Sequence, residues 1–148
     1  MSEIADFLRA RYAERRAIAE AAANLQCDPE NGWGITDTSN YAPTEKRRWI
    51  SPHIGMLHEV ESAEHIVANN PAVVIADCDA KLAIIDEHPA ATGFDGNNVS
   101  GTVCRTCGEI NYDGELTGDP YPCRTLRLLA QPFARVGRYR PEWALELG

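Results

Sequence analysis

The sequence predicts a mostly helical α+β fold of four to five helices, with a small β-hairpin or sheet and a loop region held together by zinc. Apolar residues recur at helical spacing in several stretches, while short apolar segments broken by Gly, Pro, Thr and Ser occupy residues 30–56. A histidine and three cysteines with metal-ligand spacing follow in the second half. At 148 residues the chain is expected to form a single domain, residues 1–148.

The first helix is expected at residues 2–25, which contain neither glycine nor proline. Ser2 can cap it, and Cys27-Asp28-Pro29 follows its end. The small β region is then expected at residues 30–56, with short strands near residues 32–35 and 48–50. Trp33 and Trp49 are the expected aromatic anchors of this region.

Helices are expected from residue 57 to residue 88. A short helix at residues 57–69 is followed by Asn70, a good N-cap, and by Pro71, which suits the first helical position. The central helix then runs from Pro71 to about His88. One apolar stripe follows helical spacing and consists of Val74, Cys78, Leu82 and Ile85. Three further residues are expected to widen it: Val73, Ala76 and Ala80.

The spacing H-x15-C-x2-C-x15-C indicates a metal site made by His88, Cys104, Cys107 and Cys123. Zinc takes four tetrahedral ligands, and thiolate and imidazole are its usual protein donors. The C-x2-C pair places two sulfurs on one tight turn, where Gly108 is expected to supply a positive φ. A site with four protein ligands is closed, which is typical of structural zinc.

Alternatives remain for each ligand. The cysteines can be ordinary reduced thiols, or a redox C-x-x-C pair, although that reading needs a βαβ context. His88 can be a helix C-cap, with His53, His58 or His65 as other ligands. Cys27 and Cys78 are expected to be spare thiols, buried rather than reactive.

Two glycine- and asparagine-containing loops are expected within the zinc-binding region of residues 88–123, at residues 89–103 and 108–122. Long loops of this kind are uncommon unless something holds them, so metal binding and local folding are expected to be coupled. C-terminal helices are expected at residues 123–147. The first runs from Cys123 to Phe133 and ends near Pro132, and a last short helix docks Trp143.

Composition limits the function. The formal net charge of −8 argues against general nucleic-acid or anionic-membrane binding. No apolar run approaches the roughly 18 residues that span a bilayer. The N-terminal stretch has no apolar signal core, and five cysteines fit a reducing compartment, so a cytoplasmic protein is expected.

Several motifs resemble an uncharacterised family of small proteins from actinobacteria and their phages, a domain of unknown function. They are FLRARYAE, AEHIVANNPAVVIADCDAKLAIIDEH, CRTCG, PCRTLRLLAQPFA and YRPEW. In that family the histidine and the three cysteines tend to occur together, which favours His88, Cys104, Cys107 and Cys123 as one set. Asp79, where glutamate is usual, departs from the pattern without touching a ligand. The resemblance implies no activity, and its phage members suggest a role during infection.

The sequence therefore predicts a non-enzymatic interaction module with a structural zinc. Residues 59–119 hold twelve acidic residues and two basic ones, whereas residues 124–140 hold five arginines and no acid. A basic protein partner or a homo-oligomer is expected. The alternative is a nucleic-acid-binding protein that uses the zinc knuckle and the arginine patch, Arg124, Arg127, Arg135, Arg138 and Arg140. An enzyme would need an open metal position.

Overall fold

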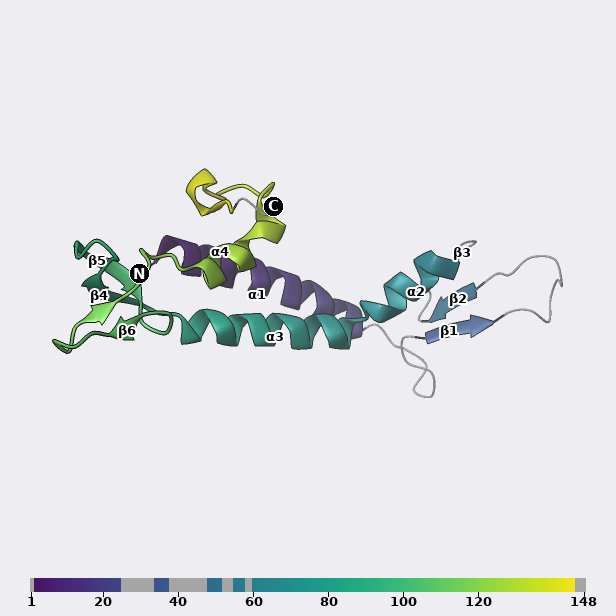
Figure 1. Cartoon of the computed structure of the whole chain (residues 1–148). Helices are drawn as coiled ribbons and strands as arrows, with labels where there is room; N and C mark the ends of the chain where they lie inside the picture. Colours follow the sequence, from purple (N-terminus) through teal and green to yellow (C-terminus); the bar gives the residue numbers. More distant parts are fainter. Residues whose placement is uncertain (1, 25–33, 38–47, 52–54, 58–59, 146–148) are drawn as a thin grey trace. The chain divides into compact units, whose positions relative to one another are not determined.

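We describe residues 2–24, 34–37, 48–51, 55–57 and 60–145 in a computed structural model of the chain (Figure 1). The chain forms two compact units, one made by Met1–Glu14 with Asp79–Gly148 and the other by Arg15–Cys78. The boundary runs through helices α1 (Glu3–Ala23) and α3 (Pro71–Glu87), so each of these helices contributes a segment to both units. That the chain is one domain stays a prediction.

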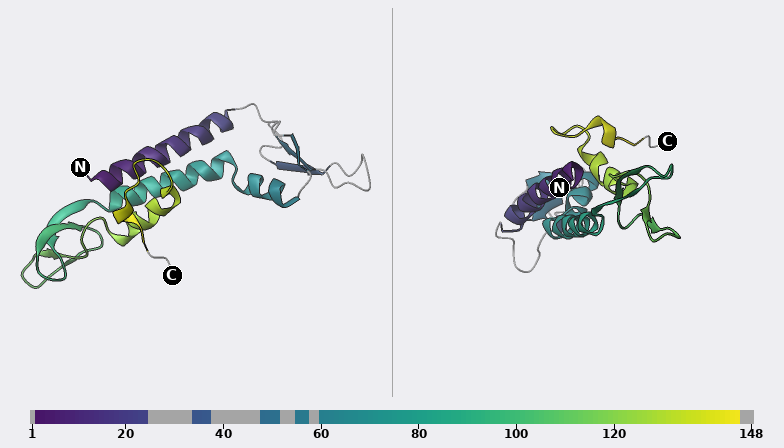
Figure 2. Two further views of the ribbon diagram at one scale, coloured as in Figure 1. Left: turned by 90° about the horizontal axis from the view of Figure 1, so that it is seen from above. Right: turned by 90° about the vertical axis from the view of Figure 1, so that its left-hand side faces the viewer.

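Three helical segments form the core of the first unit: the start of α1, the end of α3, and α4 (Arg124–Ala130). Figure 2 shows them side by side from two further directions. Arg9 of α1 pairs with Asp86 of α3 at 2.8 Å, and the Tyr12 hydroxyl donates to the Leu129 carbonyl at 3.0 Å. The side chains buried along these segments are apolar at helical spacing, as predicted: Ile4, Leu8, Ile85, Leu126 and Ala130.

The chain after α4 closes one side of this core. Pro132 interrupts the α-helix, which continues as a 3₁₀ turn, η1 (Gln131–Phe133), and a second 3₁₀ turn, η2 (Pro141–Trp143), follows. Trp143 is buried, with its ring centroid 5.2 Å from that of Phe7. The predicted end of the helix near Pro132 and the docking of Trp143 are both confirmed.

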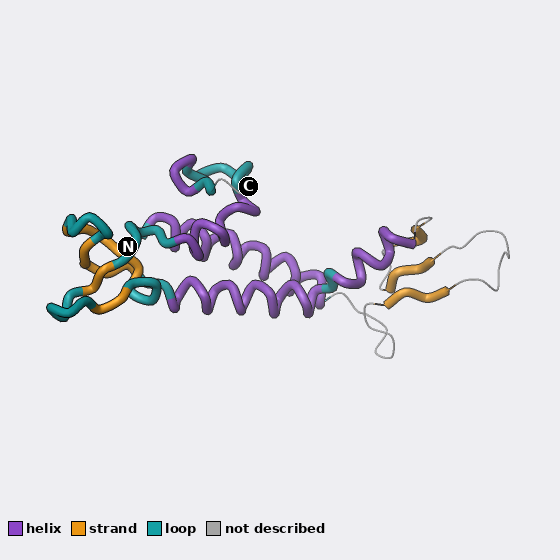
Figure 3. Tube along the Cα trace, in the orientation of Figure 1, coloured by secondary structure: helices purple, strands orange, loops and turns teal. Residues whose placement is uncertain are grey.

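A four-stranded mixed sheet follows α3 in the first unit (Figure 3). Its strands are β4 (Ala90–Phe94), β5 (Ser100–Cys104), β6 (Glu109–Ile110) and β7 (Leu116–Thr117), in the order β5-β4-β7-β6. β4 pairs antiparallel with β5 and parallel with β7. The prediction that residues 89–103 and 108–122 are loops is therefore wrong. The strands are short, and half of their residues are exposed, so no period-2 apolar pattern marks them.

The second unit contains a three-stranded antiparallel sheet, β1 (Gly34–Asp37), β2 (Arg48–Ser51) and β3 (Gly55–Leu57), against which α2 (Val60–Ala68) packs. The predicted small sheet is confirmed. The Asn70 side chain accepts the Val73 N–H at 3.2 Å, which confirms it as the cap of α3. The predicted roles of Cys27, Trp33, His53, His58 and the Trp49 side chain lie outside the described residues.

The apolar stripe of α3 is narrower than predicted. Cys78 and Ile85 are buried, and Val74 and Leu82 are half-buried. Val73, Ala76 and Ala80, which were expected to widen the stripe, are exposed. Apolar residues of α3 therefore lie on more than one side of the helix, and only some of them are buried. This explains why apolar periodicity alone overestimated its buried face. Of the helices that the structure describes, none has the length and hydrophobicity needed to cross a membrane.

Candidate metal centre

The four residues singled out by their spacing meet in the first unit. One ligand atom from each of His88, Cys104, Cys107 and Cys123 lies within 4.8 Å of all the others. His88 directly follows α3, Cys104 ends β5, Cys107 lies in the turn between β5 and β6, and Cys123 directly precedes α4. A helix end, a turn between two strands and a helix start thus converge, and the resulting cluster could hold a metal ion.

The distances identify Nδ1 as the histidine donor. The Nδ1 atom of His88 lies 3.4 Å from the Cys104 sulfur, 3.4 Å from the Cys107 sulfur and 3.6 Å from the Cys123 sulfur. Zinc bonds of about 2.3 Å to sulfur and about 2.0 Å to nitrogen, at tetrahedral angles, put each N–S edge at about 3.5 Å. The donor set therefore fits one tetrahedral zinc ion.

The sulfurs differ in their access to solvent. Cys104 and Cys123 are buried, His88 is half-buried and Cys107 is exposed. No disulfide joins these cysteines, which are all free thiols. In the absence of metal, partial burial of its sulfur, with smaller effects from the Cys104 and Cys123 thiols, raises the pKa of Cys107 to about 12. Burial likewise raises the pKa of Cys123, and the Leu126 N–H opposes that shift. The Cys107 and Cys123 thiols therefore resist ionisation until a bound cation stabilises their thiolates.

Hydrogen bonds tie the turn of residues 104–108, here called the knuckle turn, to the end of α3. The Gly108 N–H donates to the Cys104 carbonyl at 2.9 Å and closes the turn. The Arg105 N–H donates to the Pro89 carbonyl at 3.0 Å, and the Thr106 hydroxyl donates to the Glu87 carbonyl. These bonds hold both knuckle sulfurs beside His88, and each ends on a backbone carbonyl, which a sequence pattern does not reveal.

Glycine is needed at position 108 for space rather than for its φ angle. Gly114 is the glycine with positive φ among the described residues, so the expectation of a positive φ at Gly108 is wrong. A Cβ atom at Gly108 would lie 2.9 Å from the Thr117 carbonyl oxygen and 3.0 Å from that of Cys104. Gly118 packs directly against Gly108, and Gly93 is similarly crowded by Leu116. The last two glycines were missed because nothing in the sequence distinguishes them from turn glycines.

Cys123 occupies the N-cap position of α4, with extended backbone angles of φ −64° and ψ 163°. Its carbonyl accepts the Arg127 N–H at 3.1 Å, which starts the helix. The sequence placed this cysteine at a helix start, and the structure confirms that position.

The structure describes one other histidine, His65, and one other cysteine, Cys78, and both belong to the second unit. His65 is exposed and its Nδ1 lies 3.5 Å from the Asn69 amide nitrogen. Cys78 is a buried thiol within α3, as predicted. Within the described part of the chain, the four proposed ligands form the metal-ligating cluster and His65 does not join it.

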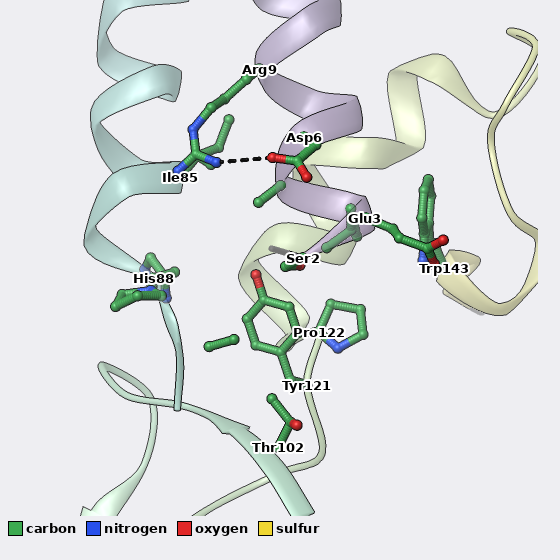
Figure 4. A pocket seen from close by; sticks show the side chains of 14 residues that line it. Ser2, Glu3, Asp6, Arg9, Ile85, His88, Thr102, Tyr121, Pro122 and Trp143 are labelled. Carbon is green, nitrogen blue, oxygen red and sulfur yellow. Dashed lines mark ion pairs between the residues drawn. The ribbon is translucent and has the colours of Figure 1, made fainter. Parts of the chain in front are cut away.

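A pocket of about 680 Å³ adjoins the cluster, and His88 belongs to its wall (Figure 4). Arg9 and Asp6 form an ion pair of 3.6 Å on one side of the pocket. The Tyr121 hydroxyl is buried without a hydrogen bond of ordinary geometry among the described residues. Its pKa is raised by burial, although the neighbouring Ser2 hydroxyl lowers it. A small molecule in this pocket would lie beside a metal ligand, not between the sulfurs.

A family model matches residues 1–145, almost the whole chain, including all four residues of the cluster. The chain belongs to the family of unknown function DUF6221. The resemblance to an uncharacterised family is confirmed at that level. No curated protein and no solved structure matches this DUF6221 chain. The family supplies no activity, so the function has to be argued from the cluster and from the surface.

Proposed function

We propose that the protein is a small cytoplasmic zinc-binding protein whose zinc is structural, and that it acts as a non-enzymatic interaction module. The observation that supports this most is the set of three nearly equal distances from His88 Nδ1 to the three sulfurs. Three thiolates and an imidazole complete a tetrahedron, which leaves no position for a substrate or a reactive water. Three thiolates also outweigh the charge of the cation, so the centre would be a poor Lewis acid.

The structural role is supported by the elements that the cluster joins. The β4–β7 sheet has short strands and few buried side chains, so its own packing stabilises it weakly. When bound, zinc would supply a cross-link between the end of α3, the knuckle turn and the start of α4. The free energy of metal binding then becomes free energy of folding.

The partner class follows from charge. The acidic stretch of residues 59–119 favours a basic protein partner or a second copy of the chain. The resemblance to proteins of actinobacteria and their phages favours a phage-encoded protein that acts on a host protein in the host cytoplasm.

Metal analysis tests the zinc proposal directly. Protein purified without added metal is expected to contain one zinc per chain, and His88→Ala is expected to lose the zinc or a large part of its thermal stability. His65→Ala, at an exposed histidine outside the cluster, is the matched control. Full zinc retention by His88→Ala with unchanged stability would show that His88 is not a ligand and would reopen the enzymatic alternative.

The nucleic-acid alternative is supported by Arg124, Arg135 and Arg138, which are exposed. Two arginines of the same patch are engaged within the molecule. Arg127 donates to the Trp143 and Ala144 carbonyls, and Arg140 pairs with Glu3. Because two of the five arginines already have partners within the molecule and the net charge is −8, the patch is a weak phosphate-binding surface. A gel-shift at low salt with mixed single- and double-stranded nucleic acid is expected to show no retardation.

A further inference from the structure

A second groove lies in the first unit, away from the metal cluster. Its volume is about 550 Å³. Apolar and aromatic side chains form part of its wall, with Phe7, Tyr139 and Trp143 packed edge to face or tilted against one another. Five charged side chains complete the lining: Arg11, Arg138 and Arg140, together with Glu3 and Asp6. Glu3 pairs with Arg140, and Asp6 pairs with Arg9.

Two of these arginines have donors to spare. The Nε–H of Arg11 is buried with no hydrogen-bond partner in the part of the chain that the structure describes, although its Nη1 pairs with Glu14 at 3.0 Å. Arg138 takes a φ of 71°, in the left-handed region that side chains other than glycine rarely adopt. Its guanidinium has no ion pair among the described residues. A buried orphan donor and an unpaired cation beside aromatic rings fit a carboxylate next to an apolar side chain.

The β6–β7 hairpin presents that chemistry. Asn111 organises its tip, because its Oδ1 accepts the N–H groups of Asp113 at 3.0 Å and Glu115 at 2.8 Å, and Gly114 takes a φ of 79°. Tyr112 is fully exposed at this tip and Ile110 is 67% exposed. Glu109, Asp113 and Glu115 are exposed around them, and residues 108–122 contain no basic residue. The hairpin is therefore a preformed, acidic and aromatic projection.

We propose that the β6–β7 hairpin of one molecule docks into this groove on a second copy of the chain. Tyr112 would pack on the aromatic wall, and a hairpin carboxylate would pair with the exposed Arg138 guanidinium, beside Arg11. Because Tyr112 is fully exposed, the hairpin does not occupy the groove of its own molecule. The proposal rests on the interaction role proposed above and names its partner.

Such a contact joins different surfaces on the two molecules. It is heterologous, so association continues into an open chain or closes into a ring. Pairing between a hairpin carboxylate and the groove arginines makes the association sensitive to salt.

Sedimentation velocity of the zinc-loaded full chain tests this proposal, with Tyr112→Ser as the hairpin variant and Arg138→Gly as the groove variant. Glycine suits the backbone at position 138, and Tyr112 contacts no core residue, so both variants should fold. The sedimentation coefficient of the wild-type protein is expected to increase with protein concentration, and high salt should reverse this increase. Each variant alone should be monomeric, whereas an equimolar mixture should form a 1:1 dimer through the one intact hairpin and the one intact groove.

Val99→Ser and Arg135→Ala are the matched controls, at an exposed apolar residue of the other hairpin and at an arginine outside the groove. Both should associate like wild type. A wild-type chain that stays monomeric at its highest soluble concentration, or an assembly that survives both test substitutions, would overturn the proposal. Zinc measured in the same samples separates the two ideas, because monomeric protein with full zinc leaves the metal proposal intact.

Discussion

Gly108 has no side chain, and this lets the knuckle turn lie against β7. Its absent Cβ atom would fall about as close to the Leu116 side chain, 2.9 Å, as to the backbone of Thr117. Gly108→Ala is expected to lower the free energy of unfolding by about 1–3 kcal/mol, because backbone atoms cannot move aside cheaply. Urea unfolding of the zinc-loaded protein measures this loss. Gly96→Ala is the control, since nothing lies within 4 Å of that added carbon, and an equal loss there would contradict the steric explanation.

Cys107 should make the stability of the metal-free protein depend on pH. Its pKa is raised from 9.0 to about 12 by partial burial and by the neighbouring thiols, so the folded form holds the proton more tightly than the unfolded chain. The stabilisation is fully present below pH 9 and is lost as the pH rises from 9 toward 12. Urea unfolding of chelator-treated, reduced protein along this range measures the decline. In Cys107→Ser the decline should be shallower, and an unchanged slope would assign it to other groups.

The four residues that meet in the cluster were predictable from the sequence because zinc chemistry restricts both residue type and spacing. Spacing alone left other histidines open as the fourth ligand, and the family resemblance favoured His88. Gly118 and Gly93 were not predictable as packing residues, because each is defined by a strand that approaches it from elsewhere in the chain. Arg11 was not predictable either, since what marks it is a buried Nε–H without a hydrogen-bond partner among the described residues.

At the scale of elements, the start of α3 depends on one side chain. Asn70 accepts the Val73 N–H, one of the helical donors that has no partner within the helix. Asn70→Ala is expected to lower the free energy of unfolding by about 1 kcal/mol, with zinc content unchanged. Thermal melting and metal analysis measure the two quantities. Asn97→Ala is a suitable control, because Asn97 donates through its backbone N–H and its exposed side chain is dispensable for that bond.

Helices were easier to predict than strands. Apolar spacing and capping residues located α1, α3 and α4 to within a few residues. In the β4–β7 sheet, β6 and β7 escaped detection because they have two residues each, too few to show an alternating pattern. Pairing between β4 and β7, which are distant in sequence, is what organises these segments. Such pairing leaves no local signal.

At the scale of the whole molecule, the cluster lies in one of the two units, made by Met1–Glu14 and Asp79–Gly148. Removal of metal by a strong chelator is therefore expected to act locally. Amide hydrogen exchange should accelerate in β4–β7 and in the knuckle turn, which the cluster joins to α3 and α4. The amides of α2, which packs on the other sheet, serve as the internal control. Uniform acceleration, or none at all, would contradict a local structural role for the metal.

Cys107 differs from the other sulfurs of the cluster because it faces solvent. Exchange of a bound ion would therefore begin at Cys107. An incoming chelator or acceptor protein would replace this thiolate before the buried Cys104 and Cys123 thiolates dissociate. The same exposure makes Cys107 the first atom that an alkylating reagent or peroxide meets. The exposed Cys107 sulfur would thus control how long a metal ion stays bound, more than the ligands that lie deeper in the protein.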